Sequence, residues 1–146
     1  MADTAPLQFG LPDPGVSYRD RPAAFAVIPH QGKIALVRIS LPDRPPFLDL
    51  PGGALEAGET HEQAMVREVG EEAGLVAQPG RRLLHADQYL RKSDGEPVNN
   101  RSWVFEARLA GEDTSLKIED DHELVWIEPD QALRQLRHDS HAWAVA

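Results

Sequence analysis

Three glutamates stand within one helical turn near the middle of the chain, at positions Glu68, Glu71 and Glu72. At about 100° per residue, Glu72 lies about 40° to one side of Glu68, and Glu71 lies about 60° to the other side. Like charges this close on a helix repel one another, so the cluster needs a counter-charge. Carboxylate oxygens are hard ligands that suit Mg²⁺ or Mn²⁺. By spacing alone, the cluster is compatible with a divalent metal site or with a solvated acidic face.

The segment from Thr60 to Ala73 carries these glutamates and is predicted to be a helix. Thr60 is a good N-cap, Gln63 three residues later completes a capping box, and Gly74 supplies a C-terminal stop. An apolar side for the core lies next to the acidic stripe. Its residues are Met65, Val66, Val69 and Ala73.

The residues around this helix follow a longer pattern, G-x5-E-x7-R-E-U-x-E-E-x-G-U, in which U is a bulky aliphatic residue. Gly53 is followed after five residues by Glu59, and seven more residues lead to Arg67-Glu68. The remaining positions are Val69, Gly70, Glu71, Glu72, Ala73, Gly74 and Leu75. Every specified position matches, so the segment from Gly53 to Leu75 resembles the signature of the Nudix hydrolases.

The resemblance implies a fold, a set of metal ligands and a cofactor. The fold would be a Nudix-type α/β/α sandwich with a mixed central sheet and at least two helices. In the family this motif forms a loop–helix–loop that holds a divalent metal over a diphosphate. Arg67 would pair with the carboxylate of Glu59 and orient the cluster. The expected cofactor is Mg²⁺, with Mn²⁺ as the alternative, and the implied ligands are Glu68, Glu71, Glu72 and the main-chain carbonyl of Gly53.

The implied reaction is hydrolysis of a diphosphate linkage in a nucleoside diphosphate joined to another moiety. Metal ions would neutralise phosphoryl oxygens and hold a water, and a carboxylate would accept the proton of that water. Glu68 is one candidate for this base, and Glu119 or Asp120, before the strand that contains Trp126, are others. That acidic stretch is also compatible with a solvated loop. A nucleotide-sensing or protein-binding Nudix domain without catalysis is the alternative function.

Three residues outside the motif are candidate substrate contacts. Arg38 on a predicted strand could reach a phosphate, Tyr89 could stack on a base, and Asn100 at a loop–strand junction could contact a sugar or phosphate. Each also has a structural interpretation, as an exposed strand charge, a core aromatic and a turn residue respectively. The choice among nucleoside triphosphates, nucleotide sugars and dinucleoside polyphosphates stays open.

The composition limits the class of protein. A chain of 146 residues has the size of one domain. Its net charge of −9 disfavours general binding to nucleic acid, which depends on neutralising phosphates. No apolar run approaches the roughly 20 residues that span a bilayer, no signal-peptide pattern is present, and there is no cysteine. We therefore expect a cytoplasmic protein that acts on a small-molecule nucleoside diphosphate derivative, with no nucleic acid and no membrane as partners. A homodimer stays open, because many family members dimerise.

The predicted organisation is an irregular, Pro- and Gly-rich N-terminal arm over residues 1–20 and a single Nudix hydrolase domain over residues 21–146. A turn at Gln31-Gly32 joins the first two strands, and a second helix begins at Pro129. Strands are predicted at Ala23–Ile28, Lys33–Ile39, Leu48–Leu50, Leu83–Arg91, Ser102–Ala110 and Leu124–Ile127.

Overall fold

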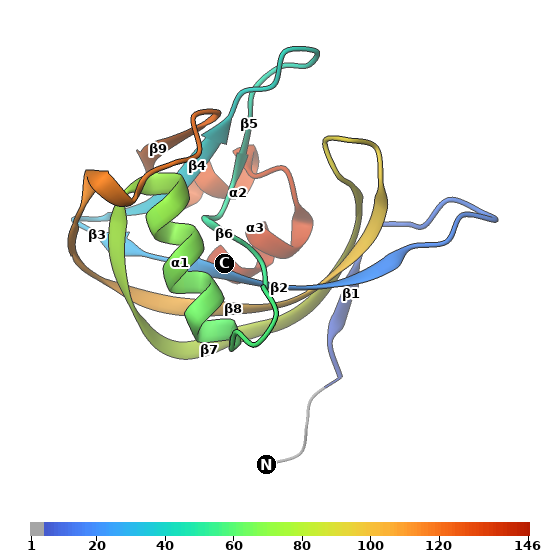
Figure 1. Ribbon diagram of the computed structural model, residues 1–146, viewed down its shortest axis with the longest axis horizontal. Helices are drawn as coiled ribbons and strands as arrows, with labels where there is room; N and C mark the ends of the chain where they lie inside the picture. Colours follow the sequence, from blue (N-terminus) through green and yellow to red (C-terminus); the bar gives the residue numbers. More distant parts are fainter. Residues whose placement is uncertain (1–4) are drawn as a thin grey trace.

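The computed structural model describes residues 5–146 and shows two β-sheets with helices on both sides (Figure 1). Within these residues the strands are β1 (Leu7–Phe9), β2 (Arg19–Val27), β3 (Pro29–His30), β4 (Lys33–Ile39), β5 (Phe47–Asp49), β6 (Gly52–Ala54), β7 (Leu75–Arg91), β8 (Pro97–Glu112) and β9 (His122–Ile127). The helices are α1 (His61–Ala73), α2 (Pro129–Gln135) and α3 (Asp139–Val145), with a 3-10 turn η1 (Thr114–Leu116). None of the helices in this range is long and apolar enough to cross a membrane.

The larger sheet has the strand order β1-β7-β8-β2-β6 and contains both parallel and antiparallel pairs. Strand β8 pairs antiparallel with β7 and parallel with β2, so it lies in the middle of the sheet. The second sheet is built around β4, which pairs with β3, β5 and β9. This mixed arrangement confirms the predicted fold class.

Alternating residues of β2 separate two layers of core. Ala24 and Ala26 belong to the cluster that contains Met65 and Val69 of α1. Phe25 points the other way, into the cluster that includes Ala132 of α2. Successive strand side chains face opposite sides of a sheet, so β2 is buried on both faces. Helix α1 covers one face, and α2 and α3 lie on the other side, as Figure 1 shows.

Both ends of α1 are fixed by the residues that the sequence indicates. The Thr60 hydroxyl accepts a hydrogen bond from the Gln63 amide at 3.1 Å, and the Gln63 side chain accepts one from the Thr60 amide at 2.9 Å. Gly74 ends the helix in the left-handed conformation, with φ of 67°, which glycine adopts without strain. These local caps set the rotation and position of the acidic stripe.

The other predicted elements are present with different lengths. Strand β4 has its predicted bounds, and the turn before it places Gln31 and Gly32 at positive φ. Strand β7 begins at Leu75 rather than Leu83. Pro79 would normally interrupt the hydrogen bonds between β7 and β8, but register shifts around it let the two strands stay paired. Strand β8 likewise begins at Pro97 instead of Ser102, so it takes up part of the segment between the two predicted strands. Helix α3 follows α2 as a separate element.

The predicted N-terminal arm over residues 1–20 is irregular over most of its described part. Residues 1–4 lie outside the described residues. Leu7–Phe9 form β1, which pairs in parallel with β7, and β2 already begins at Arg19. Asp13 binds Arg91 of β7 at 3.0 Å, so this segment also contacts the end of the β7–β8 hairpin.

Candidate active site

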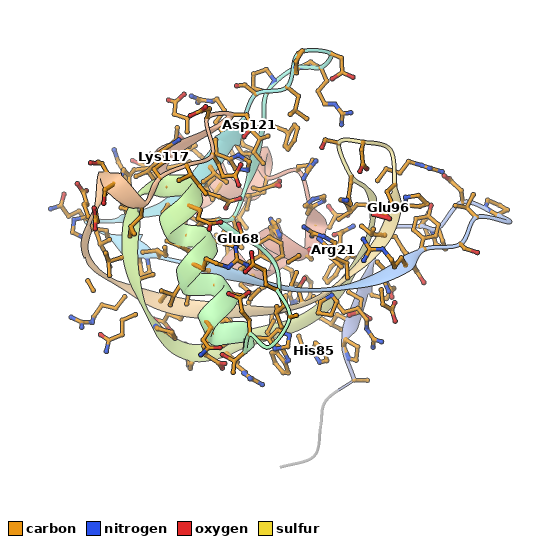
Figure 2. All side chains as sticks on the ribbon, in the orientation of Figure 1. Arg21, Glu68, His85, Glu96, Lys117 and Asp121 are labelled. Atoms are coloured by element: carbon orange, nitrogen blue, oxygen red, sulfur yellow. The ribbon has the colours of Figure 1, made fainter. Side chains whose placement is uncertain are left out.

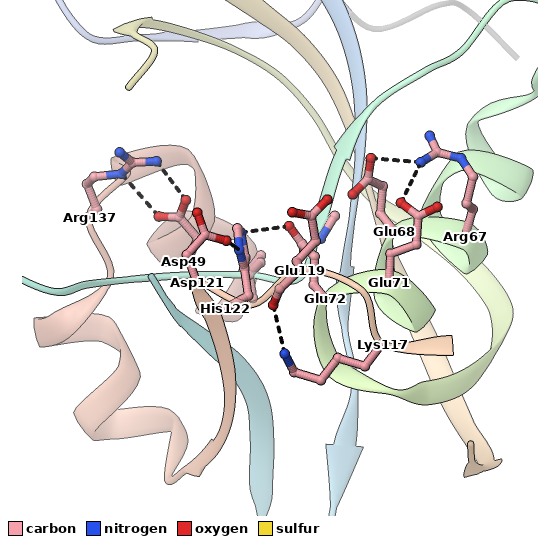
Figure 3. A network of polar contacts seen from close by, with 12 residues as sticks. Asp49, Arg67, Glu68, Glu71, Glu72, Lys117, Glu119, Asp121, His122 and Arg137 are labelled. Atoms are coloured by element: carbon pink, nitrogen blue, oxygen red, sulfur yellow. Dashed lines mark hydrogen bonds and ion pairs between the residues drawn. The ribbon is translucent and has the colours of Figure 1, made fainter. Parts of the chain in front are cut away.

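Arg67 lies at the centre of the acidic cluster and donates hydrogen bonds to three glutamates. Its Nε and Nη2 donate to the two carboxylate oxygens of Glu59 at 2.8 and 3.0 Å, which is the expected pair. Its Nη1 donates to Glu68 Oε1 at 2.9 Å and to Glu71 Oε2 at 3.1 Å (Figure 3). Nη2 also donates to the carbonyl of Ala54 at 3.0 Å. The hydrogen bond with Arg67 lowers the pKa of Glu59, and the hydrogen bond with Glu59 raises the pKa of Arg67, so both members of this pair are charged at neutral pH.

Glu72 is the most buried of the three clustered glutamates. Its Oε1 accepts a hydrogen bond from the Gly52 amide at 2.9 Å, and its Oε2 lies 3.1 Å from His122 Nε2 (Figure 3). Burial raises the pKa of Glu72 to about 7. Burial alone would lower the pKa of His122, but hydrogen bonds with Glu72 and Asp121 raise it to about 9. The pair therefore couples the end of α1 to the start of β9.

Strand β6 runs close against the acidic face of α1, and glycines make this approach possible. A Cβ at Gly53 would lie 2.8 Å from Glu68 Cδ, which is closer than a real side chain tolerates. Gly52 has φ of 148°, and a Cβ there would lie 2.2 Å from the carbonyl oxygen of Ala24. The result is a set of hard oxygen donors on one side of α1, from Glu68, Glu71, Glu72 and the main chain of β6. This donor chemistry fits Mg²⁺ or Mn²⁺.

A loop after β8 brings further acidic groups to the same end of α1. The amides of Ile118 and Glu119 both donate to the carbonyl of Glu71, at 2.9 and 3.1 Å. One ligand atom each from Glu119, Asp121 and His122 can lie within 4.8 Å of the others. Burial is the main cause that raises the pKa of Glu68, and the negative charge of Glu119 acts in the same direction. Asp120 is exposed and is not part of that group.

A cavity of about 210 Å³ opens beside Glu72. At one end it is lined by Gly52, Gly53 and Glu72 from the acidic site. Its apolar wall consists of Phe25, Ile39, Leu41, Phe47 and Leu90. Its polar and charged lining includes Arg21, Asp49, Arg91, Lys92, Ser93, Asn100, Asp121, His122, Arg137 and His138. The cavity therefore extends from the carboxylate cluster to a wall of apolar, polar and charged side chains. This lining suits a charged ligand that also has an apolar part.

One side of this wall is held together by an ion pair between β5 and the segment after α2. Arg137 Nη2 lies 2.7 Å from Asp49 Oδ2, and its Nε donates to Oδ1 at 3.2 Å (Figure 3). The same guanidinium lies 3.9 Å from the centre of the Phe47 ring. Behind it, burial lowers the pKa of His138 to about 4, and His141 accepts a hydrogen bond from the Leu50 amide at 3.1 Å. This wall is therefore ordered by charge pairing and by neutral, buried imidazoles.

Of the three substrate contacts suggested by the sequence, one lines the cavity and two lie outside it. Asn100 lines the cavity. Arg38 forms an exposed ion pair with Glu123 at 3.5 Å, and Tyr89 packs edge-on against Tyr18 with ring centres 5.0 Å apart. Neither belongs to the cavity lining found within residues 5–146.

Sequence reasoning missed the lining residues Arg21, Asp49, Arg137 and His138. The signal that could have found Arg21 is the pairing of β2 with β8, which sets it opposite Asn100. This parallel pairing joins residues about eighty positions apart, and local patterns do not reveal it. His122 was likewise not selected, because no spacing links it to Glu72.

Comparison with known proteins gives one family. A family model described as the NUDIX domain matches residues 19–145. The chain is 36% identical over 109 residues to an 8-oxo-(d)GTP phosphatase of Mycolicibacterium smegmatis, covering 73% of this chain and 32% of that protein. It is 29% identical over 110 residues to the CTP pyrophosphohydrolase of Escherichia coli, covering 75% of this chain and 76% of that protein. The chain thus spans about a third of the length of the first relative and about three quarters of the second.

Solved structures agree with this result. A NUDIX hydrolase from Nitrosomonas europaea superposes with a TM-score of 0.70 at 23% identity, covering 87% of this chain and 86% of that one. The MutT NUDIX hydrolase from Burkholderia pseudomallei gives a TM-score of 0.62 at 27% identity, with coverage of 87% and 96%. The first likeness supports the fold alone.

Proposed function

The chain belongs to the Nudix hydrolase family, and on this basis we propose that it is a divalent-metal-dependent pyrophosphohydrolase of nucleoside diphosphate derivatives. The observation that carries the proposal is the cluster of three glutamates on α1, in which Arg67 holds Glu68 and Glu71 while Glu72 lines an open cavity. A clustered set of carboxylates next to a cavity that also contains cationic and apolar groups suits a ligand with a diphosphate and a nucleoside part.

The residues that would hold the metal are Glu68, Glu71, Glu72 and the main-chain carbonyl of Gly53. A bound Mg²⁺ or Mn²⁺ would neutralise phosphoryl oxygens and lower the pKa of a bound water. Arg67 donates to one oxygen each of Glu68 and Glu71, which leaves the other oxygen of each carboxylate without a hydrogen bond to the guanidinium. Both oxygens of Glu72 are engaged, one by the Gly52 amide and the other by His122. Such outer contacts orient metal ligands and limit the number of arrangements they adopt.

Proton acceptance from the attacking water is assigned to Glu68 or Glu119. Burial raises the pKa of Glu68, which makes this carboxylate a better proton acceptor near neutral pH. Glu119 lies on the loop that is hydrogen-bonded to the carbonyl of Glu71. Asp120, the third candidate, is exposed and has only its place in the sequence as support.

For the substrate, we propose a nucleoside 5′-triphosphate, in which water would cleave the bond between the α- and β-phosphates to give a nucleoside monophosphate and inorganic diphosphate. One observation supports this class over a nucleotide sugar. The two relatives described above are named for 8-oxo-(d)GTP and CTP, both nucleoside triphosphates.

The test is product release from a panel of nucleoside triphosphates, oxidised nucleoside triphosphates, nucleotide sugars and dinucleoside polyphosphates. Each is assayed with Mg²⁺, with Mn²⁺ and with excess chelator. We expect metal-dependent release of diphosphate from at least one triphosphate. Binding of nucleotide and metal without turnover would instead support the non-catalytic sensing function.

The cytoplasmic location and the homodimer remain predictions that accompany this proposal. Sedimentation of the purified chain would test the second.

A further inference from the structure

We propose that Arg21, held in place by Asn100, is the residue of this cavity that binds a phosphoryl oxygen of the substrate. This inference rests on the proposed function and deepens it, because it names the part of the site that recognises the anionic portion of the ligand. It also assigns to Arg21 the phosphate contact that the sequence had suggested for Arg38.

Arg21 is positioned by strand pairing and by a side-chain hydrogen bond. It lies on β2 directly opposite Asn100 of β8 in the parallel ladder. Its Nη1 donates to Asn100 Oδ1 at 3.0 Å, and Asn100 itself is only 5% exposed. Figure 2 shows Arg21 between Glu68 on α1 and the β7–β8 hairpin, near Glu96. Both Arg21 and Asn100 line the cavity that contains Glu72.

The charge of Arg21 is balanced differently from that of the other cations in the cavity lining. Arg91 pairs with Asp13 at 3.0 Å, Lys92 pairs with Glu96 at 3.2 Å, and Arg137 pairs with Asp49 at 2.7 Å. Among residues 5–146, no carboxylate lies within ion-pair distance of Arg21, and its hydrogen-bond partner is a neutral amide. Arg21 is therefore the lining cation that remains available to an anion.

Because Arg21 is partly buried, leaving its charge without a counter-ion costs free energy. Burial lowers the pKa of Arg21, while the more distant charges of Glu68 and Glu72 act to raise it. An arginine stays protonated even so, and a partly buried guanidinium without a counter-ion is costly. Because Glu68 and Glu72 are the proposed metal ligands, their charge is committed to the metal when it is present. A phosphoryl oxygen entering the cavity would supply the missing counter-charge.

The shape of the side chain suits the same ligand. A guanidinium is a planar fork whose donors match two phosphate oxygens, and Arg is the preferred residue for such contacts. With Nη1 engaged by Asn100, the plane of the fork is fixed while Nε and Nη2 have no hydrogen-bond partner within the described part of the chain. Asn100 thus acts as a positioning residue and Arg21 as the binding residue.

The experiment compares Arg21→Gln with Arg19→Gln, which removes the same charge two residues away on the same strand. Arg19 is exposed and pairs with Glu96 at 2.8 Å, and it is not part of the cavity lining, so it is a matched control. Binding is measured by calorimetry with a triphosphate whose scissile bridge is a non-hydrolysable methylene group. The same titration is made with the corresponding uncharged nucleoside. Mn²⁺ binding is followed separately by electron paramagnetic resonance, and KM and kcat are measured with the hydrolysable triphosphate.

We expect Arg21→Gln to weaken binding of the analogue and raise KM by about 10- to 100-fold, the range for one charged hydrogen bond. Arg19→Gln should remain within about twofold of the wild type. The affinities for the uncharged nucleoside and for Mn²⁺ should be unchanged in both variants. Arg21→Lys, which keeps the charge without the fork, should recover part of the loss, and it replaces Arg21→Gln if that variant does not fold.

The proposal is overturned if a folded Arg21 variant binds the analogue within twofold of the wild type. It is also overturned if the loss is equally large for the uncharged nucleoside, because Arg21 would then only support the cavity wall. A wild-type chain that binds the analogue but hydrolyses nothing would reject the proposed function and leave the binding test of Arg21 valid. A wild-type chain that binds no phosphorylated nucleotide would reject both.

Discussion

Arg67 Nε lies 2.8 Å from Glu59 Oε2, so a glutamate outside the helix anchors the arginine that binds two of the proposed metal ligands. Glu59 itself is tied to the chain before α1, because its Oε1 accepts the Glu56 amide at 2.7 Å. The loop before α1 therefore controls the orientation of Glu68 and Glu71 through Arg67.

Glu59→Gln should reduce activity without removing a metal ligand. Losing the charge weakens the hold on Arg67, and outer-contact changes of this kind cost about 10- to 100-fold in metal affinity or activity. The measurement is kcat as a function of Mg²⁺ concentration, in which the midpoint should move to higher Mg²⁺. Glu62→Gln is the matched control, since Glu62 lies in the first turn of α1, close in sequence to Glu59, and pairs with exposed Arg82 at 3.2 Å. Equal Mg²⁺ midpoints in both variants would show that Glu59 does not organise the cluster.

Glu71→Gln should abolish most metal-dependent turnover while the chain stays folded. The amide keeps the size of the side chain but removes the negative charge that a divalent ion requires. We expect a fall in kcat of at least about 100-fold, comparable to the loss of a key electrostatic group. Circular dichroism and thermal unfolding check the fold. Full activity in this variant, or unchanged wild-type turnover in excess chelator, would remove Glu71 or the metal from the mechanism.

The neighbouring glycines of β6 should respond differently to alanine. A Cβ at Gly53 would meet the Glu68 carboxylate, the far end of a flexible side chain, so Gly53→Ala should displace Glu68 and lower kcat with a smaller stability loss than Gly52→Ala. A Cβ at Gly52 would meet the backbone of Ala24 and Phe25 at positive φ, so Gly52→Ala should cost about 2 kcal/mol or more. Urea unfolding and steady-state kinetics on both variants check this. A Gly53→Ala variant with normal kcat would contradict the close approach.

His138 should make the fold less stable in acid. Its pKa is about 4 in the folded chain, because burial disfavours the charged form, and about 6.5 in the unfolded chain. The unfolded state therefore binds more protons between these values, and stability is lost as the pH falls from about 6.5 to 4. The loss from this residue is about 3 kcal/mol. It is measured as the difference in unfolding free energy between the wild type and His138→Gln at pH 7, 5.5 and 4.

Taking the difference between the wild type and His138→Gln removes the contribution of Glu72 to the pH dependence of stability. The raised pKa of Glu72 acts in the opposite direction, since folding then favours its protonated form as the pH falls through 7. This contribution is common to both proteins and cancels in the difference. An advantage of the wild type that does not shrink on acidification would mean that His138 is not held neutral.

The sequence predicts α1 and its cluster well, because the signals are local. Thr60, Gln63 and Gly74 are caps that act within one turn of the helix end, and the contact of Arg67 with Glu59 spans only a short loop. The cavity wall could not be predicted in this way. The contacts of Arg21 with Asn100 and of Arg137 with Asp49 join segments about eighty or more residues apart, and each depends on how the sheets are assembled. Strand propensity also gave no reason to extend β7 through Pro79.

The acidic cluster and the wall of the cavity stand on different pieces of the chain. The cluster belongs to β6 and α1, which are joined by a short segment, whereas Asp49, Arg91 and Arg137 come from β5, β7 and the connection between α2 and α3. Changes in that wall can alter ligand preference without moving the proposed metal ligands. The architecture thus offers a route for a new specificity to arise by exchange of short surface segments, either in the course of evolution or in the laboratory.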